Sequence, residues 1–204
     1  DINPVAYLLS DLTCNPPNSE KFEKEIGSII KDLKLKYSKF YKTSKDEEVK
    51  YYVHEIYALC KFCNTNQSSE QVKKLKKKNK CIKCDKRISF SLENLNETKI
   101  TKVIYKNNLI TSSRSELSWA KNLENYNFDD SNLNYDYPFI ENNRILSFKG
   151  MKTSNLFTKR NFYILSKLAD SFHNIKNSKI RDAALLLLTS SVAQSSRLIA
   201  YRNN

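Results

Sequence analysis

Cys60-Lys-Phe-Cys63 and Cys81-Ile-Lys-Cys84 are two C-x-x-C pairs separated by 17 residues. Each pair can form a tight turn that points two thiolates at one ion, and structural four-cysteine zinc sites have this kind of spacing. Four sulfur ligands complete a tetrahedral shell, which leaves no coordination position for catalysis. We therefore predict that these four cysteines hold one structural zinc ion.

A disulfide pair and a redox C-x-x-C are the competing interpretations of these cysteines. The first segment lacks the basic and apolar regions of a signal peptide, which argues against disulfides, and the repeated spacing argues against a single redox motif. His54, six residues before Cys60, is interpreted as a strand residue, with a substitute metal ligand or a group that supports the ligands as the alternative. Cys14 lies in an apolar segment, and we expect it to be a small buried hydrophobe.

The residues that flank the two cysteine pairs predict a small β-rich module. Segments 51–59 and 86–92 are rich in β-forming residues and suggest hairpins. Between the pairs, residues 72–80 include six lysines in nine positions. Two interpretations of this tip are equally open: it is a charged loop that keeps the protein soluble, or it contacts nucleic-acid phosphates through Lys76, Lys77 and Lys78.

The charge balance favours a polyanionic partner. The chain of 204 residues has 35 basic and 22 acidic side chains, a formal net charge of +13. Nucleic acid and an anionic membrane surface are the usual partners of such a surface. The longest apolar run, 183–188, is far shorter than the roughly 20 residues of a spanning helix. We expect a soluble, cytoplasmic protein without a membrane partner.

The remaining pattern divides the chain into four expected segments, 1–48, 49–94, 95–150 and 151–204. The first has an amphipathic helix at 19–42 after Pro16-Pro17, and the second is the zinc module. The third has a strand or hairpin at 99–112 and then an irregular loop at 122–143. The last has two helices, one capped by Thr158 and one that starts at Asn177 or Ser178, and we expect Leu187 on the inner face of the second.

The sequence contains few signs of self-sufficient catalysis, and we name no catalytic residue. Gly27 and Gly150 are the only glycines, so there is neither a dinucleotide-binding glycine motif nor a P-loop. Cys14-Asn-Pro-Pro-Asn18 superficially resembles the Asp/Asn-Pro-Pro-aromatic loop of amino methyltransferases, but Asn18 stands where an aromatic residue should stack on the base. We interpret Asn15 to Asn18 as a loop that ends a helix.

Asp1-Ile-Asn-Pro-Val-Ala6 fits a strand end followed by a helix start with proline in the first turn. In a doubly wound fold a carboxylate at this place accepts hydrogen bonds from ribose hydroxyls. Asp1 and Asn3 are therefore the candidate cofactor-binding residues.

Taken together, these motifs resemble the bacterial and archaeal DNA modification methylases of the amino type that carry an inserted zinc ribbon. The resemblance spans most of the chain. It rests on D-I-N-P-V-A, the two C-x-x-C pairs, Asn155-Leu-Phe-Thr-Lys-Arg-Asn161 at the opening of a helix, and Ser195-Ser196-Arg197. The glycine-rich cofactor loop and the Pro-Pro-Tyr-type catalytic loop of that family have no counterpart here, so the match corresponds to an internal portion.

The resemblance implies an α/β or α+β fold, with a partial doubly wound methyltransferase layer interrupted by the zinc ribbon. It implies part of an S-adenosylmethionine-dependent enzyme that methylates the exocyclic nitrogen of adenine or cytosine in DNA. This chain alone is not expected to be active, and its partners would be DNA and the remaining portions of the enzyme. When the target base is flipped out of the duplex, basic side chains of the protein are needed to hold the distorted DNA strand. The candidates are Lys159, Arg160 and Arg197, and the alternative is that these side chains are simply solvated at helix ends.

A rival interpretation is a non-enzymatic zinc-ribbon module that binds nucleic acid or a protein. Trp119 is compatible with stacking on a base, but a lone tryptophan in a mixed segment is more typical of a core anchor. His173 is interpreted as a helix-terminal residue that complements the helix dipole.

Overall fold

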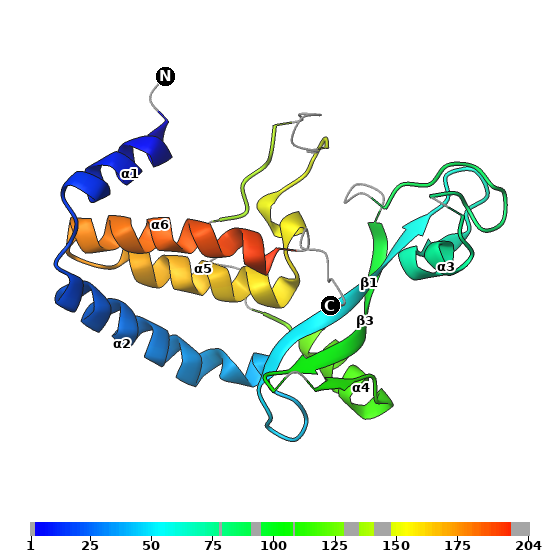
Figure 1. The fold of residues 1–204 in the computed structure, drawn as a ribbon, viewed down its shortest axis with the longest axis horizontal. Coiled ribbons are helices and arrows are strands. Elements are labelled where there is room, and N and C mark those ends of the chain that lie inside the picture. Colours follow the sequence, from blue (N-terminus) through cyan, green and yellow to red (C-terminus); the bar gives the residue numbers. More distant parts are fainter. Residues whose placement is uncertain are drawn as a thin grey trace. The chain divides into compact units, whose positions relative to one another are not determined.

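The computed structural model describes residues 3–77, 79–90, 95–107, 109–128, 135–140 and 148–196. The chain combines helices with an antiparallel sheet and divides into two compact units (Figure 1). The helical unit comprises Asp1–Phe40, Asn127–Tyr137 and Leu156–Asn204, and the sheet unit comprises Tyr41–Tyr126 and Pro138–Asn155. Because the units are defined by contacts in space, their boundaries differ from those of the four segments expected from sequence.

Among its described residues, the helical unit contains four α-helices, each preceded by a polar residue that caps its first turn. Asn3, Asn18 and Thr158 accept hydrogen bonds from backbone N–H groups at the starts of α1, α2 and α5, and Asn177 does so for α6. The helices are α1 (Pro4–Cys14), α2 (Ser19–Tyr37), α5 (Lys159–His173) and α6 (Ser178–Ser195), and the short 3-10 helix η1 (Ser38–Tyr41) follows α2. The predicted cap at Thr158 and the predicted helix starts are confirmed.

The core of the helical unit lies among α2, α5 and α6. It combines the apolar stripe of α2 with the facing stripes of the two later helices, and its buried members are Ile26, Phe172, Ile175, Ile180 and Ala184. Figure 1 shows α2, α5 and α6 alongside one another. Next to this core, the rings of Phe40 and Phe128 lie 5.1 Å apart and those of Phe128 and Tyr163 lie 4.9 Å apart, within the usual range of aromatic pairs.

The sheet unit is built on one long antiparallel pair. Strands β1 (Val49–Leu59) and β3 (Leu95–Tyr105) pair along their length, with β2 (Asn66–Ser68) and β4 (Ile110–Thr111) at the two edges in the order β2-β1-β3-β4. Register shifts between Val53 and His54 and between Tyr57 and Ala58 interrupt the β1–β3 ladder. The predicted hairpin in 99–112 is confirmed by β3 and β4, and His54 is a strand residue as expected.

One face of the long pair is covered by α4 (Arg114–Glu124). Val49, Val103 and Ala120 form the buried contact between helix and sheet. The Glu116 carboxylate, 5% exposed, accepts hydrogen bonds from the Ser44 backbone and hydroxyl groups. Trp119 Nε1 donates to the Lys42 carbonyl oxygen at 3.0 Å, but Trp119 is 39% exposed, so it is not the buried core anchor that the sequence predicts.

Three other sequence-based predictions about local structure are wrong. Segment 86–92 does not form a strand over its described residues, where Arg87 makes only an isolated bridge to Lys80, because β1 pairs with β3 instead. Cys14 is exposed rather than buried, since α1 leaves neighbouring apolar side chains such as Tyr7 in solvent. Leu187, expected to face inward, is 48% exposed.

Mixed helices and an antiparallel sheet make the fold α+β at the level of class. The strand pairs described are all antiparallel, so a doubly wound methyltransferase layer stays a prediction. Within the part of the chain that is described, no helix has the length and apolar content needed to cross a membrane.

We expect the Phe172→Ala substitution to lower the free energy of unfolding by about 3–5 kcal/mol, because it leaves a cavity where a ring 2% exposed now packs. Leu187→Ala, on the neighbouring helix, is the control and should cost less than about 1 kcal/mol. Urea denaturation monitored by circular dichroism measures both values. Equal effects of the two substitutions would contradict the assigned core.

Candidate metal centre

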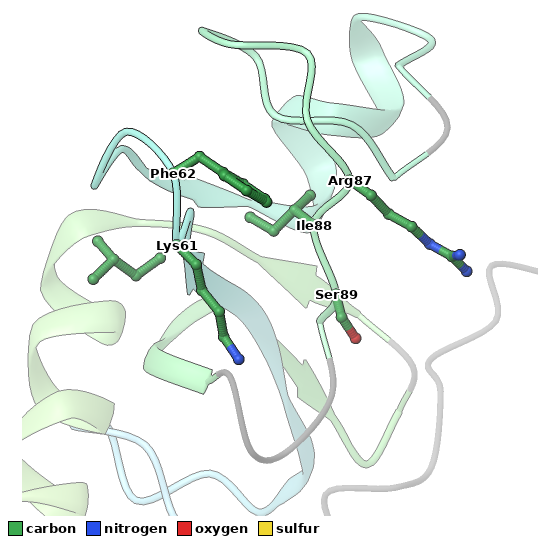
Figure 2. Close-up of a pocket in the computed structure, with 6 residues that line it drawn as sticks. Lys61, Phe62, Arg87, Ile88 and Ser89 are labelled. Atoms are coloured by element: carbon green, nitrogen blue, oxygen red, sulfur yellow. The ribbon is translucent and has the colours of Figure 1, made fainter.

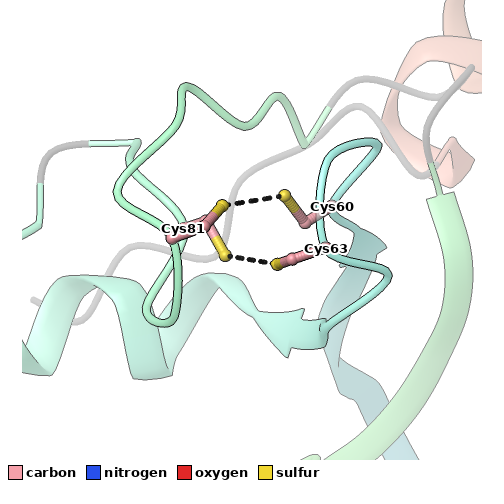
Figure 3. A group of neighbouring side chains, drawn as sticks. Cys60, Cys63 and Cys81 are labelled. Carbon is pink, nitrogen blue, oxygen red and sulfur yellow. Dashed lines mark hydrogen bonds between the residues drawn. The ribbon is translucent and has the colours of Figure 1, made fainter.

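The four cysteines of the two C-x-x-C pairs converge at one end of the sheet unit. Cys60 directly follows the last residue of β1, so the strand delivers the first pair to the site. Cys81 and Cys84 come from the loop after α3 (Ser69–Lys74). Figure 3 shows the first pair facing Cys81 across a short gap.

The two pairs form turns with the same hydrogen-bond pattern. In the first, Cys60 N donates to Thr65 O at 3.0 Å and Asn64 N donates to Cys60 O at 2.9 Å. In the second, Cys81 N donates to Lys86 O at 2.8 Å and Asp85 N donates to Cys81 O at 3.1 Å. The offsets from the first cysteine of each pair are identical, so the two turns are built alike.

Each turn contains one residue with a left-handed backbone, directly after its second cysteine. Asn64 has φ 53° and Asp85 has φ 57°. Asparagine and aspartate adopt this conformation more readily than other residues except glycine. A C-x-x-C followed by Asn or Asp is therefore a sequence signal for the turn geometry, and the prediction from cysteine spacing alone did not use it.

The sulfur positions fit a tetrahedral metal ion. The Sγ atoms of Cys60 and Cys84 are 3.6 Å apart, those of Cys63 and Cys81 are 3.5 Å apart, and all four lie within 4.8 Å of one another. Tetrahedral zinc with Zn–S bonds of about 2.3 Å needs S···S separations of roughly 3.8 Å, whereas a disulfide needs about 2.05 Å. All four thiols are free, so these cysteines form a possible metal-binding site.

The pKa values of the cysteine thiols also favour binding of a cation at this site. Burial raises the pKa of Cys81, but N–H groups of Cys84 and Lys83 stabilise its thiolate, and the pKa falls to about 6. The Lys86 backbone lowers the pKa of Cys84, but burial and the neighbouring thiols raise it to about 12. Burial and hydrogen bonds with the neighbouring cysteines therefore favour the protonated form of Cys84, and a divalent ion would replace this proton and allow all four thiols to ionise.

Gln67 on β2 supports the second turn, and the sequence analysis missed it. Its side chain is fully buried, with 0% exposure, and its Oε1 accepts a hydrogen bond from Ile82 N at 2.8 Å. The same side chain favours the thiolate form of Cys81. Groups that orient metal ligands from outside the ligand set commonly have this role. A lone glutamine in a three-residue strand has no spacing that would have revealed it.

The segment between the pairs is more ordered than the predicted loop. Ser68 and Gln71 form a reciprocal capping box at the start of α3, with bonds of 2.9 and 3.1 Å. Beyond α3, Lys76 is exposed, while Lys77 pairs with Asp85 at 2.8 Å and is therefore partly neutralised. Lys78 lies outside the described residues.

The other predicted site residues belong to the helical unit. Asn3 caps α1 by accepting from Val5 N at 3.0 Å, and Lys159 is exposed in the first turn of α5. Arg160 is only 2% exposed, and its Nη1 donates to the Phe40 carbonyl oxygen at 3.3 Å, so its side chain faces the interior in this arrangement. Asp1 and Arg197 lie outside the described residues. The cofactor and DNA contacts of these residues stay predictions.

Comparison of the chain with protein-family models, with curated proteins and with solved structures finds no match. The assignment to a methylase family therefore rests on the sequence motifs alone.

We expect Cys81→Ser to abolish stoichiometric zinc binding, because a hydroxyl replaces a buried thiolate ligand. Cys14→Ser is the matched control, since Cys14 is exposed and is not a member of the cluster. Elemental analysis after dialysis should show one zinc ion per chain for the control and close to none for Cys81→Ser. Full zinc retention by Cys81→Ser would refute the four-cysteine site.

Proposed function

We propose that Cys60, Cys63, Cys81 and Cys84 bind one structural zinc ion, and that the zinc-stabilised module contacts DNA. We further propose that it does so as part of an S-adenosylmethionine-dependent DNA methyltransferase of the amino type. The observation that carries the proposal is the convergence of four thiols within 4.8 Å in a module that also bears exposed lysines.

A structural role for the ion follows from the ligand set. Four cysteine sulfurs complete the tetrahedral coordination of zinc and leave no position for water or substrate. The small apolar cluster around them consists of Ala58, Cys60, Cys81 and Ile88, with Phe90 against its edge. A cluster of this size contributes little burial, so we expect the metal to provide much of the local stability.

DNA contact is supported by the placement of charge on the same module. Lys73, Lys76 and Lys80 are exposed, and they lie between the two cysteine pairs in the sequence. Lysines on an exposed surface neutralise phosphates and release counterions, which gives affinity without sequence preference. Nucleic acid also suits the net charge of +13.

The methyltransferase part of the proposal rests on the resemblance described above. In such an enzyme the target base leaves the duplex before its exocyclic nitrogen receives the methyl group of S-adenosylmethionine. Asp1 and Asn3 would lie beside the cofactor ribose, and Lys159 would contact the distorted strand from the exposed first turn of α5. Other portions of the enzyme would supply the cofactor loop and the catalytic loop.

A non-enzymatic zinc module that binds nucleic acid or a protein is the second candidate. It is favoured by the position of the cysteines, the sheet and the lysine-rich segment within one compact unit. Such a module needs no cofactor and no catalytic loop.

The DNA contact is tested by the triple substitution of Lys73, Lys76 and Lys80 with alanine in the zinc-loaded protein. Each lost phosphate contact should reduce the slope of log affinity against log salt by about 0.9 for duplex DNA, so the slope should fall by about 2–3. The control replaces Lys21, Lys24 and Lys31, which are exposed on α2. Fluorescence anisotropy across a salt series measures the slopes, and an unchanged slope in the tip variant would refute the contact.

Calorimetric titration with S-adenosylmethionine separates the two candidates. The methyltransferase proposal predicts binding by the protein extended at both ends, with weak or no binding by the 204-residue chain. DNA binding without cofactor binding by either protein would leave the non-enzymatic module as the function.

A further inference from the structure

A pocket of about 310 Å³ lies beside the first cysteine turn, on the surface of the sheet unit. This volume is at the lower end of the range for small-molecule sites, roughly 300–1,000 Å³, so the pocket has room for a small group only. The lining residues come from the two segments next to the cysteine pairs: Leu59, Lys61, Phe62, Arg87, Ile88 and Ser89. Figure 2 shows five of them labelled, with Phe62 and Ile88 adjacent and the Lys61 and Arg87 side chains extending away from them.

The apolar part of this pocket is unusually open to solvent. Phe62 is 69% exposed and Leu59 is 41% exposed, whereas Ile88 is 5% exposed and packs into the cluster around the cysteines. Phe62 occupies the third position of the first C-x-x-C pair, so the turn that aligns two metal ligands also presents its ring outward. The equivalent position in the second turn is Lys83, so the turn geometry itself does not require an aromatic ring.

Positive charge flanks the apolar surface. Lys61 and Arg87 are both exposed, and Ser89 adds a hydroxyl group to the rim. Among the described residues that line the pocket there is no carboxylate. An exposed aromatic ring in a pocket whose rim carries two cations matches the chemistry of an unpaired nucleotide, because a base stacks on the ring while adjacent phosphates meet the charges.

We propose that this pocket binds an unpaired base of single-stranded DNA, with the base stacked on Phe62 and the flanking phosphates contacted by Lys61 and Arg87. The inference rests on the proposed DNA contact and adds a second mode of binding, base stacking, to the phosphate contacts of the lysines. The lysines of the tip attract any phosphate backbone, whereas Phe62 recognises a base whose face is accessible. In a duplex that face is covered by neighbouring base pairs.

The test compares binding of the zinc-loaded 204-residue chain to an oligothymidylate and to an abasic strand of the same length. Loss of one stacked base typically costs a factor of about ten or more in affinity. The wild type should therefore prefer the oligothymidylate about tenfold, and Phe62→Ala should abolish that preference. Phe62→Leu should also abolish it, because leucine retains apolar bulk without a ring, whereas Phe62→Trp should preserve it.

The control substitution is Leu75→Ala, which removes an apolar side chain that is 57% exposed elsewhere in the same module. It should leave the preference for bases unchanged. Zinc content near one ion per chain in every variant shows that the metal centre is intact, so a lost preference cannot arise from unfolding.

Substitution of Lys61 or Arg87 should change the salt dependence of binding rather than the preference for bases. Lys61→Ala and Arg87→Ala should each reduce the salt slope for single-stranded DNA by about 0.7, while Lys45→Ala, at an exposed site outside the pocket, should not. Phe62→Ala should leave this slope unchanged.

The outcomes also separate this inference from the proposed function. Normal DNA binding with no preference for bases over the abasic strand, or a preference that survives Phe62→Ala, would overturn the stacking site and leave the lysine contact standing. No binding to either strand or to duplex DNA would overturn both.

Discussion

The cysteine-bearing end of the sheet unit depends on four thiols whose sulfur atoms lie within 4.8 Å of one another. Thiolates at this separation repel, and the cluster around them is small, so the turn after β1 and the loop after α3 meet there only if something offsets the repulsion. A tetrahedral cation would do this and would join the two cysteine turns at one point. Several features place the four sulfur atoms together. They are the matched hydrogen bonds of the two turns, the buried Gln67 amide and the left-handed backbones of Asn64 and Asp85.

The metal centre, the exposed lysines and the pocket at Phe62 belong to one segment of the chain. The first turn aligns two ligands and presents an aromatic ring, while the chain between the pairs carries the positive charge. A rigid support of this kind lowers the entropy cost of fixing exposed side chains for binding. In the proposed DNA contact, the metal would therefore act indirectly, by fixing the groups that are proposed to contact DNA.

The features that the sequence predicted correctly are those that depend on residues close together in the chain. The spacing of Cys60, Cys63, Cys81 and Cys84 indicated the cluster, and apolar periodicity with capping residues such as Thr158 located the long helices. The partner of β1 could not be predicted in the same way, because pairing between Val49–Leu59 and Leu95–Tyr105 joins segments far apart in the chain. Short helices such as α3 depend on a capping box rather than on periodicity. The burial of Arg160 and of Gln67 reflects tertiary packing that no spacing encodes.

The central claim is that one zinc ion is bound by four sulfur ligands from this chain. X-ray absorption spectroscopy at the zinc edge of the purified protein tests it most directly, because the fine structure reports both the number and the type of ligands. We predict one zinc ion per chain with four sulfur neighbours at about 2.3 Å. Mixed coordination with nitrogen or oxygen ligands at about 2.0–2.2 Å, or protein that is folded and free of metal, would contradict it.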